Sequence, residues 1–388
     1  MIDGILYLDH NSTTPCDQRV LKAMLPYFDT EFWNAGSAHA LGRKAKAAIE
    51  QARAIAASAL GVSDDRLIFV SGATEGIQLV LERLPARMRA QVPFLASPVE
   101  HRAVRNSLER LRREGATVRF LSLDAKGIVA SDQVFGSAVV VVQAANSETG
   151  VVQPIAHLAK VVHDYGGVLI VDGAQALWKL EVEDLGRCAD ALIISAHKAY
   201  GPKGIATVVL SEEMERILRS PGIDAQERGI REGTLNTPLI VGFAEAARLA
   251  KDEGLRWRTR AQRARDHFEE MIRTVASLQM RPLLTGSPRL PNTCALHVPG
   301  VAGDALVAAC AEVALSYGTA CSSGTPAPSP ALLAFGIPWE VARQTVRVSF
   351  GRSNTPADAE RAAQCIARTA QNLCQQRSSQ CSNGAKSE

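Results

Sequence analysis

The chain has 388 residues, more than a single ordinary hydrophobic core accommodates, so two domains are expected. Hydrophobic residues make up 46% of it and charged residues 21%, the balance of a globular protein, while the net charge is only +3. That charge excludes an electrostatic case for direct nucleic-acid or membrane binding, and no apolar run approaches the roughly 20 residues of a membrane-spanning helix.

The N-terminus and the cysteines favour a cytoplasmic location. Residues 1–9 lack the basic start and the cleavage site of a signal peptide. The eight cysteines are scattered, without a CxxC pair or a His/Cys cluster at zinc spacing, so we expect free thiols in a reducing compartment and no metal site. A short basic cluster, 256–265, is interpreted as a solvated helix face.

Short β-branched runs alternate with helical patterns over the first 210 residues. Most of these runs are apolar throughout, as in strands that are covered on both faces. The alternation predicts a doubly wound α/β domain with a mainly parallel seven-stranded sheet, whose ligands gather at the carboxyl ends of the strands. The expected strands are 67–70, 94–97, 118–121, 138–143, 168–171, 192–195 and 207–210, and the expected helices lie near 40–60, 75–84, 101–114 and 154–165.

The second part of the chain predicts a smaller α+β domain. A helical pattern from Thr237 to Ala276, weakened only at Gly254, suggests a pair of helices that links two domains. Strands near 293–298 and 345–350 and helices near 303–312 and 356–375 follow. We place the large domain at 15–245, the small domain at 1–14 and 246–376, and a disordered tail without apolar pattern at 377–388.

Lys198 is badly placed for a surface charge. The segment Ser195-Ala-His-Lys198 follows an apolar run and precedes a glycine-rich turn that ends at Gly204. A desolvated lysine loses its proton more easily and becomes a nucleophile that can form a Schiff base. We therefore interpret Lys198 as the anchor of a pyridoxal phosphate cofactor.

Two further segments could hold that cofactor. Ser71-Gly-Ala-Thr-Glu75 follows a strand and opens a helix, so its backbone N–H groups could bind a phosphate, although Thr74 could instead cap the helix. Asp172 ends another strand and could keep a pyridinium nitrogen protonated, or it could serve as a helix N-cap. Gln175, one turn along, could hydrogen-bond the ring hydroxyl.

Three residues could act on the substrate. His101 could stack on the ring and shuttle protons, although a lone histidine is more often structural. Cys321 lies in a segment, 316–330, whose prolines, glycines and hydroxyl groups predict a mobile loop, which suits a nucleophile that must reach a substrate and then a partner. Arg347 could grip a substrate carboxylate in a bidentate fork, or it could be a salt-bridge partner.

Together these residues resemble the cysteine desulfurases of the NifS/IscS type, within the class V aminotransferases of PLP fold type I. The resemblance extends over about residues 5–355. The matching motifs are Tyr7-Leu-Asp-His-Asn-Ser-Thr-Thr-Pro15, Ser71-Gly-Ala-Thr-Glu75, Glu100-His-Arg-Ala-Val104, Val171-Asp-Gly-Ala-Gln175, Ser195-Ala-His-Lys198, Arg231-Glu-Gly-Thr234, Gly318-Thr-Ala-Cys321 and Val346-Arg-Val-Ser-Phe-Gly-Arg352.

The resemblance implies a role for each site residue. Lys198, Cys321 and His101 would be catalytic, and Asn34 and Arg347 would hold the substrate carboxylate. Thr234 would reach the phosphate from the second subunit of a homodimer. The residues implied to bind the cofactor are Ala73, Thr74, His101, Ser147, Asp172, Gln175, Ser195, His197, Lys198 and Thr234.

The implied reaction converts L-cysteine to L-alanine and leaves a persulfide on Cys321 for a protein acceptor, in iron–sulfur cluster assembly or nucleic-acid thiolation. A selenocysteine lyase or another class V lyase would use the same residues, and a weakly active sulfur-relay or assembly paralogue is a further alternative.

The chain departs from the pattern of this family in several places. Ser147 replaces an asparagine that contacts the ring hydroxyl, Glu232 brings a carboxylate beside the phosphate site, and Ile223-Asp-Ala225 replaces a glycine-rich run. Cys374 and Cys381 are taken as incidental.

Overall fold

The computed structural model describes residues 4–219, 226–274, 278–318 and 327–384, with side chains up to residue 376. These residues form two compact units. The larger unit comprises Thr13–Asn146 and Val152–Leu255. The smaller unit comprises the chain up to Ser12, the segment Ser147–Val151 and the chain from Arg256 onward.

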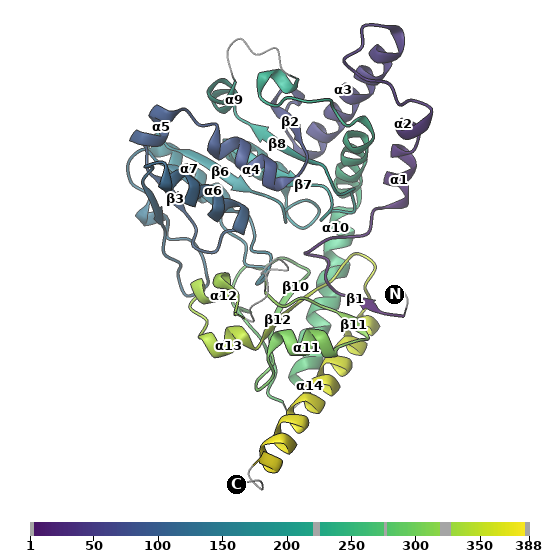
Figure 1. Cartoon of the computed structure of the whole chain (residues 1–388), viewed down its shortest axis with the longest axis vertical. Coiled ribbons are helices and arrows are strands. Elements are labelled where there is room, and N and C mark those ends of the chain that lie inside the picture. Colours follow the sequence, from purple (N-terminus) through teal and green to yellow (C-terminus); the bar gives the residue numbers. More distant parts are fainter. Residues whose placement is uncertain (1–3, 220–225, 275–277, 319–326, 385–388) are drawn as a thin grey trace. The chain divides into compact units, whose positions relative to one another are not determined.

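A seven-stranded sheet forms the centre of the larger unit (Figure 1). Its strands lie in the order β2-β8-β7-β6-β5-β3-β4, and among them only β8 runs antiparallel to its neighbours. This arrangement confirms the predicted α/β fold with a mainly parallel sheet. The strands are β2 (Leu67–Val70), β3 (Phe94–Ala96), β4 (Val118–Phe120), β5 (Val139–Gln143), β6 (Val168–Asp172), β7 (Ala191–Ser195) and β8 (Ala206–Leu210).

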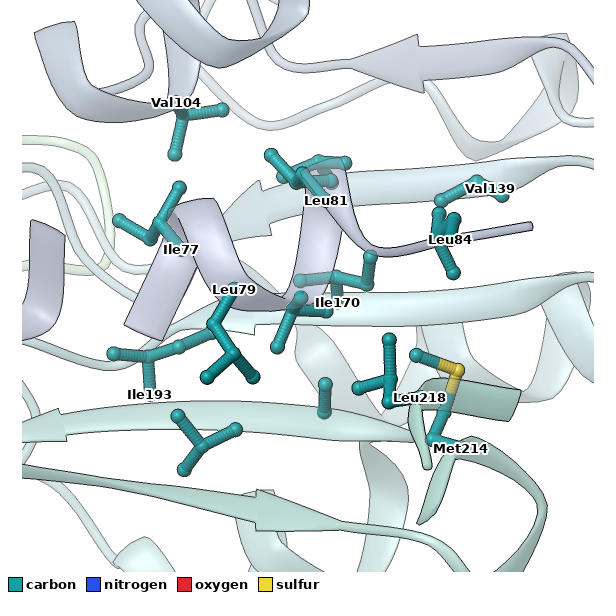
Figure 2. Close-up of a cluster of buried hydrophobic side chains, with 14 of the residues drawn as sticks. Ile77, Leu79, Leu81, Leu84, Val104, Val139, Ile170, Ile193, Met214 and Leu218 are labelled. Carbon is teal, nitrogen blue, oxygen red and sulfur yellow. The ribbon is translucent and has the colours of Figure 1, made fainter. Parts of the chain in front are cut away.

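The central strands β5, β6 and β7 are apolar up to their last residue because both faces of the sheet are covered. On one face, Val139 and Val141 of β5 belong to the cluster of buried side chains in Figure 2. On the other face, Val140 and Val142 are equally buried. The cluster includes residues of α4 (Ala73–Glu82), α6 (Arg102–Arg113) and α9 (Glu212–Leu218). A strand in such a setting has no solvent-facing side and needs no polar alternation.

The four helices that were predicted between the strands are present. They are α3 (Ala40–Leu60), α4, α6 and α7 (Ile155–Asp164). The larger unit also contains α1 (Gln18–Met24), α2 (Pro26–Asp29), α5 (Ala86–Gln91), α8 (Val182–Cys188) and the short 3-10 helices η1 (Asp64–Arg66), η2 (Ser131–Gln133) and η3 (Glu227–Gly229). In the described parts of the chain, no helix has the length and apolar character needed to cross a membrane.

The expected pair of helices after Thr237 is one continuous helix, α10 (Thr237–Thr274), so the prediction of a pair was wrong. A glycine inside a helix costs about 1 kcal/mol relative to alanine. The burial of Phe243, Trp257 and Phe268 along α10 offsets that cost at Gly254. The boundary between the two units falls inside this helix, at Leu255, where no loop marks it, whereas the sequence placed it at 245.

The smaller unit is built on a three-stranded antiparallel sheet. β10 (Thr293–His297) pairs with β12 (Thr345–Ser349) and with β9 (Arg281–Pro282), and β1 (Leu6–Tyr7) pairs with β11 (Val313–Ala314). Its further helices are α11 (Gly303–Ala309), α12 (Pro330–Ala334), α13 (Trp339–Arg343) and α14 (Pro356–Gly384). The segment Ser147–Val151 joins this unit because the Gly150 carbonyl accepts a hydrogen bond from the Leu290 N–H at 2.7 Å.

The last helix extends further than the sequence suggested. α14 continues to Gly384, where a disordered tail was expected from residue 377. No glycine or proline interrupts the chain between Ala357 and Asn383. Once the buried residues Ala359, Ala362 and Ile366 have fixed the first turns, each added residue gains a backbone hydrogen bond without a new nucleation cost.

Candidate active site

Lys198 lies three residues beyond β7, at the carboxyl end of a central strand. Its carbonyl oxygen accepts a hydrogen bond from Nε1 of Trp178 at 3.0 Å. The following turn is tight, because Tyr200 has a φ of 62° and a Cβ at Gly201 would lie 2.9 Å from the Cβ of Ala196. The turn therefore fixes the backbone of the lysine at the edge of the sheet.

His197 lies among positive charges. Burial, followed by the charges of Lys198, Lys203 and Lys179, lowers the pKa of its imidazole to about 4. Its carbonyl oxygen accepts hydrogen bonds from the backbone N–H of Thr14 at 2.8 Å and from its hydroxyl at 2.9 Å. Burial and these three ammonium groups all disfavour the charged form of the imidazole.

The N-terminus of α4 is open to a ligand. Gly72, the N-cap residue, has extended backbone and provides no side-chain cap, so Thr74 is not the capping residue that the sequence allowed as an alternative. Ala73 and Thr74 form the first turn of the helix. Glu75 turns back to accept a hydrogen bond from the Ser71 N–H at 2.5 Å. The N–H groups of this uncapped first turn and the helix dipole could bind a phosphate here.

Asp172 is the last residue of β6 and is buried. It pairs in register with Gln143 of β5 and Ile193 of β7, which places it at the middle of the sheet edge. Its Oδ1 accepts a hydrogen bond from the Ala174 N–H at 2.9 Å, within a turn and not at the start of a helix. The carboxylate is therefore held in place and could face a ring nitrogen.

His101 is the N-cap of α6, where its Nδ1 accepts a hydrogen bond from the Ala103 N–H at 3.2 Å. Burial lowers the pKa of this imidazole, the charge of Asp172 opposes that shift, and the charge of Lys198 adds to it. His101 is thus a structural cap and also interacts electrostatically with Asp172 and Lys198. A neutral ring with Nδ1 as acceptor carries its proton on Nε2.

Glu100, next to His101, was quoted only as part of a motif. It is buried, its Oε1 accepts a hydrogen bond from the Gln143 N–H at 2.8 Å, and its Oε2 has no partner among the described residues. Burial, with a smaller contribution from Asp172, raises its pKa well above the ordinary range. Burial therefore disfavours the charged form of Glu100, which lies next to His101.

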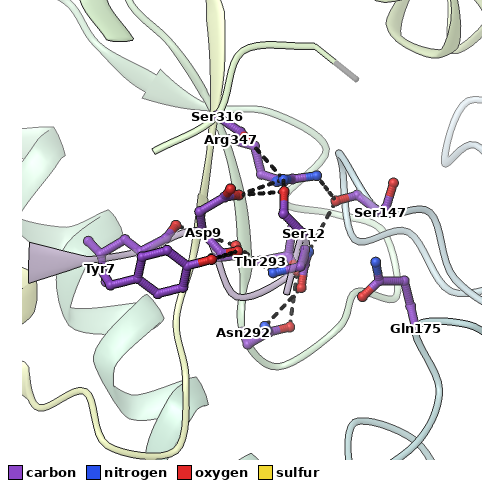
Figure 3. A network of polar contacts seen from close by, with 12 residues as sticks. Tyr7, Asp9, Ser12, Ser147, Gln175, Asn292, Thr293, Ser316 and Arg347 are labelled. Atoms are coloured by element: carbon purple, nitrogen blue, oxygen red, sulfur yellow. Dashed lines mark hydrogen bonds and ion pairs between the residues drawn. The ribbon is translucent and has the colours of Figure 1, made fainter. Parts of the chain in front are cut away.

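Arg347 of β12 is buried in a polar network of the smaller unit (Figure 3). Its Nη2 donates to Asp9 Oδ1 at 2.6 Å, Ser12 Oγ at 2.6 Å and Ser316 Oγ at 3.0 Å. Its Nη1 donates to the Ser147 carbonyl at 3.1 Å, and its Nε has no partner among the described residues. The salt bridge that the sequence allowed is thus present, and one buried donor remains for a carboxylate.

The backbone of Ser147 belongs to the same network. Its carbonyl oxygen also accepts a hydrogen bond from Asn11 Nδ2 at 3.1 Å, and Asn11 Nδ2 donates to Thr293 Oγ1 at 2.8 Å. Asp9, Asn11 and Ser12 were not singled out from the sequence, although all three lie in the first motif, Tyr7–Pro15.

Asn34 and Thr234 line one cavity of about 320 Å³ in the larger unit, together with Tyr27, Phe32 and Trp33. Both residues are exposed, and the Asn34 Oδ1 accepts a hydrogen bond from the Gly36 N–H at 2.8 Å. The structure therefore brings these two predicted residues together at the surface. Cys321, the predicted nucleophile, and residues 223–225 lie outside the described residues.

The side chains of the larger unit fit pyridoxal phosphate. An uncapped helix N-terminus suits its phosphate, and a buried carboxylate at a strand end suits its ring nitrogen. Gln175 is also buried and carries an amide that can reach a hydroxyl, and its Oε1 accepts a hydrogen bond from Nζ of Lys179, a residue that the sequence did not suggest.

Comparisons with known proteins agree with this architecture. The model of the family described as Aminotransferase class-V matches residues 6–362. A protein called Cysteine desulfurase IscS, from Anaeromyxobacter dehalogenans (strain 2CP-C), is 36% identical over 367 residues, which cover 92% of this chain and 90% of that protein.

The chain is also similar to several solved structures. One described as NIFS-LIKE PROTEIN matches with a TM-score of 0.85 at 27% identity, covering 94% of this chain and 98% of the other. One described as SspA in complex with cysteine matches with a TM-score of 0.74 at 29% identity, covering 89% of this chain and 98% of the other.

Proposed function

Since the chain belongs to the class V aminotransferases, as a cysteine desulfurase of the NifS/IscS type, we propose that it takes sulfur from L-cysteine with pyridoxal phosphate at Lys198 and passes it through Cys321 to a protein acceptor. The observation that carries this proposal is that Asp172 and Lys198 lie at the carboxyl ends of neighbouring parallel strands, with His101 close enough to interact electrostatically with both. A lysine nucleophile, a buried carboxylate and a neutral imidazole are the groups that such a reaction needs.

Bound pyridoxal phosphate would supply an aldehyde for the substrate amine and a protonated ring that draws electrons from the substrate. Asp172 would hold the proton on the ring nitrogen, and Gln175 would meet the ring hydroxyl. Lys198, once its Nζ is released, would take the proton from the substrate α-carbon, and His101 Nε2 could return a proton. Arg347 would bind the substrate carboxylate through its unpartnered Nε.

Cys321 would act as a thiolate on the sulfur of the substrate. A bond forms between Cys321 Sγ and that sulfur while the substrate Cβ–S bond breaks. The electron pair of the broken bond stays on Cβ, which then takes a proton. Alanine leaves, and the sulfur remains as a persulfide on Cys321.

The partners are part of the same proposal. Thr234 would complete the phosphate site of a second copy in a homodimer, and the acceptor would be an iron–sulfur assembly protein or a nucleic-acid-thiolating enzyme.

We also propose a cytoplasmic location, which is supported by the absence of disulfides among the six described cysteines.

Two substitutions test the proposed chemistry. Cys321→Ala should keep the absorption of the bound cofactor but lose the release of alanine and sulfide from L-cysteine in the presence of a reductant. Cys188→Ala, in α8, serves as the control and should keep full turnover. Turnover of L-cysteine by Cys321→Ala would overturn the role of Cys321, and turnover of selenocysteine alone by the unaltered protein would favour the lyase alternative.

Lys198→Ala should lose covalent attachment of the cofactor. After borohydride reduction, mass spectrometry should find the reduced cofactor on Lys198 of the unaltered protein and of the control Lys203→Ala. No such adduct is expected in Lys198→Ala, and an adduct there would refute the anchor.

A further inference from the structure

Lys179 is a buried ammonium group that the proposed function does not use. Only 1% of the residue is exposed. Its Nζ donates a hydrogen bond to Oε1 of Gln175, four residues earlier, and lies 5.6 Å from the centre of the Trp178 ring. A lysine so deep in the protein is rare without a specific partner.

The contact with Lys179 fixes the orientation of the Gln175 amide. An ammonium group has three donors and no acceptor, so the atom of Gln175 that faces Nζ must be the carbonyl oxygen Oε1. The amide NH₂ of Gln175 then points to the other side. Without Lys179, either end of the amide could face a ligand.

The same segment also holds the cofactor anchor. Trp178, next to Lys179, donates its indole N–H to the carbonyl oxygen of Lys198 at 3.0 Å, and its ring packs against Tyr200 at 5.9 Å. Both aromatic residues have left-handed backbone, with φ of 64° and 62°. Non-glycine residues adopt this conformation at a cost that the surrounding structure must impose, which is frequent at functional sites.

We propose that Lys179 is a positioning residue, which turns the NH₂ of Gln175 toward the ring hydroxyl of bound pyridoxal phosphate and favours the deprotonated form of that hydroxyl by its charge. This inference rests on the proposed function, because it requires the cofactor at Lys198. It assigns Gln175 the role of a hydrogen-bond donor. Ser147, which replaces an asparagine at the hydroxyl side of the family's site, makes that donor more important.

Other charged groups near Lys179 and Gln175 would also influence a pH titration of the bound cofactor. The electrostatic interactions of His197 and His101 show which other charged or titratable groups of the larger unit lie nearby, namely Lys198, Lys203, Arg102, Asp172, His101 and His197. Lys203 is exposed, whereas Lys179 is not. Lys203→Met therefore removes a nearby charge without touching Gln175 and is the matched control.

The test is the pH dependence of the visible absorption of the bound cofactor. Lys179→Met keeps most of the side-chain volume and suits an apolar site. It should move the midpoint of this titration upward by about one pH unit, because the lost cation had favoured the anionic form. The dissociation constant of pyridoxal phosphate for the apoprotein should rise several-fold. Lys203→Met should move the midpoint by much less.

Gln175→Glu is a second variant that does not depend on the folding of Lys179→Met. It keeps a partner for Lys179 but has no N–H for the ring hydroxyl, so the midpoint should rise at least as far as in Lys179→Met. In a Gln175→Leu background, Lys179→Met should have a smaller effect than in the unaltered protein. An unchanged midpoint in Gln175→Glu, or equal shifts for the two lysine variants, would overturn the inference.

If the proposed function itself were wrong, these experiments would give a different result. In that case the unaltered protein itself would bind no pyridoxal phosphate and show no cofactor absorption. If the unaltered protein binds the cofactor and only the predicted shifts are missing, the role of Lys179 alone is refuted.

Discussion

Arg347 forms the salt bridge that the sequence offered as one alternative and keeps a donor for the other, the proposed grip on a substrate carboxylate. Its Nη2 forms an ion pair with Asp9, while its buried Nε has no partner in the described part of the chain. The ion pair fixes the guanidinium and balances its charge in a buried place, where an unpaired cation would be costly. The remaining donor can then serve a substrate carboxylate.

The lowered pKa of His197 also predicts that the free energy of unfolding depends on pH. In the folded chain the pKa of His197 is about 4, chiefly because of burial, whereas an unfolded histidine has a pKa of about 6.5. At pH 7 the imidazole is neutral in both states. As pH falls below 6.5, the unfolded chain binds a proton that the folded chain does not, so the free energy of unfolding decreases.

The effect can be isolated in the apoprotein by urea unfolding at pH 7 and pH 5. His197→Gln should reduce the loss of stability between these pH values by roughly 2 kcal/mol, somewhat less if solvent screens the partly exposed ring. His157→Gln, at an exposed position in α7, should leave the loss unchanged. Equal pH dependence in His197→Gln and the unaltered protein would contradict the lowered pKa.

At the scale of elements, the sheet brings the site residues of the larger unit together. Asp172 ends β6 and Lys198 follows β7, and these strands are parallel neighbours, so both residues lie at the same edge. α4 packs closely on this sheet, since a Cβ at Gly76 would lie 3.0 Å from Cγ2 of Val208. The open N-terminus of α4 is therefore held by its contact with the strands, and not by a side-chain cap.

Two glycines beside the site should respond differently to substitution. A Cβ at Gly173 would lie 2.7 Å from Cδ1 of Leu192 and 3.0 Å from the Ile193 carbonyl oxygen, so Gly173→Ala should destabilise the apoprotein by about 1–3 kcal/mol. A Cβ at Gly72 would meet nothing within 4 Å, so Gly72→Ala should change stability by less than about 0.5 kcal/mol. Urea unfolding measures both. A loss in Gly72→Ala as large as in Gly173→Ala would contradict this packing.

At the scale of the whole molecule, two of the predicted site residues, Asn34 and Thr234, are exposed in a single chain. Asn34 and Thr234 share a cavity whose aromatic side chains include Phe32, which is 69% exposed. An exposed aromatic side chain of this kind fits a surface that a second copy would cover. This agrees with the proposal that Thr234 acts in the site of a partner.

Mixed dimers can test whether Thr234 acts across subunits. Lys198→Ala and Thr234→Ala should each bind pyridoxal phosphate poorly as homodimers. In a mixed dimer, the site that contains an intact Lys198 would receive an intact Thr234 from the other subunit. One tight site per mixed dimer is therefore expected in a cofactor titration. If Thr234 acts within its own chain, no tight site will appear.

The sequence predicted much of the fold and of the candidate site because strands and turns depend on nearby residues. The apolar runs identified all seven strands of the large sheet, and the residues just beyond them included Asp172 and Lys198. The contact of Arg347 with Asp9 was not predictable in this way, because 338 positions separate the two residues. Neither was the continuity of α10 at Gly254, where the packing of distant side chains outweighs a local preference.

By itself, the sequence determined the α/β class, the family and the set of groups that a pyridoxal phosphate site requires, because these follow from local pattern and from residue type. Only the tertiary structure decided how the groups are oriented. It paired Arg347 with Asp9, left the N-terminus of α4 uncapped and placed Lys179 against Gln175. Orientation depends on the backbone conformation of each turn and on which side chains meet when the chain packs, and a linear pattern does not contain that information.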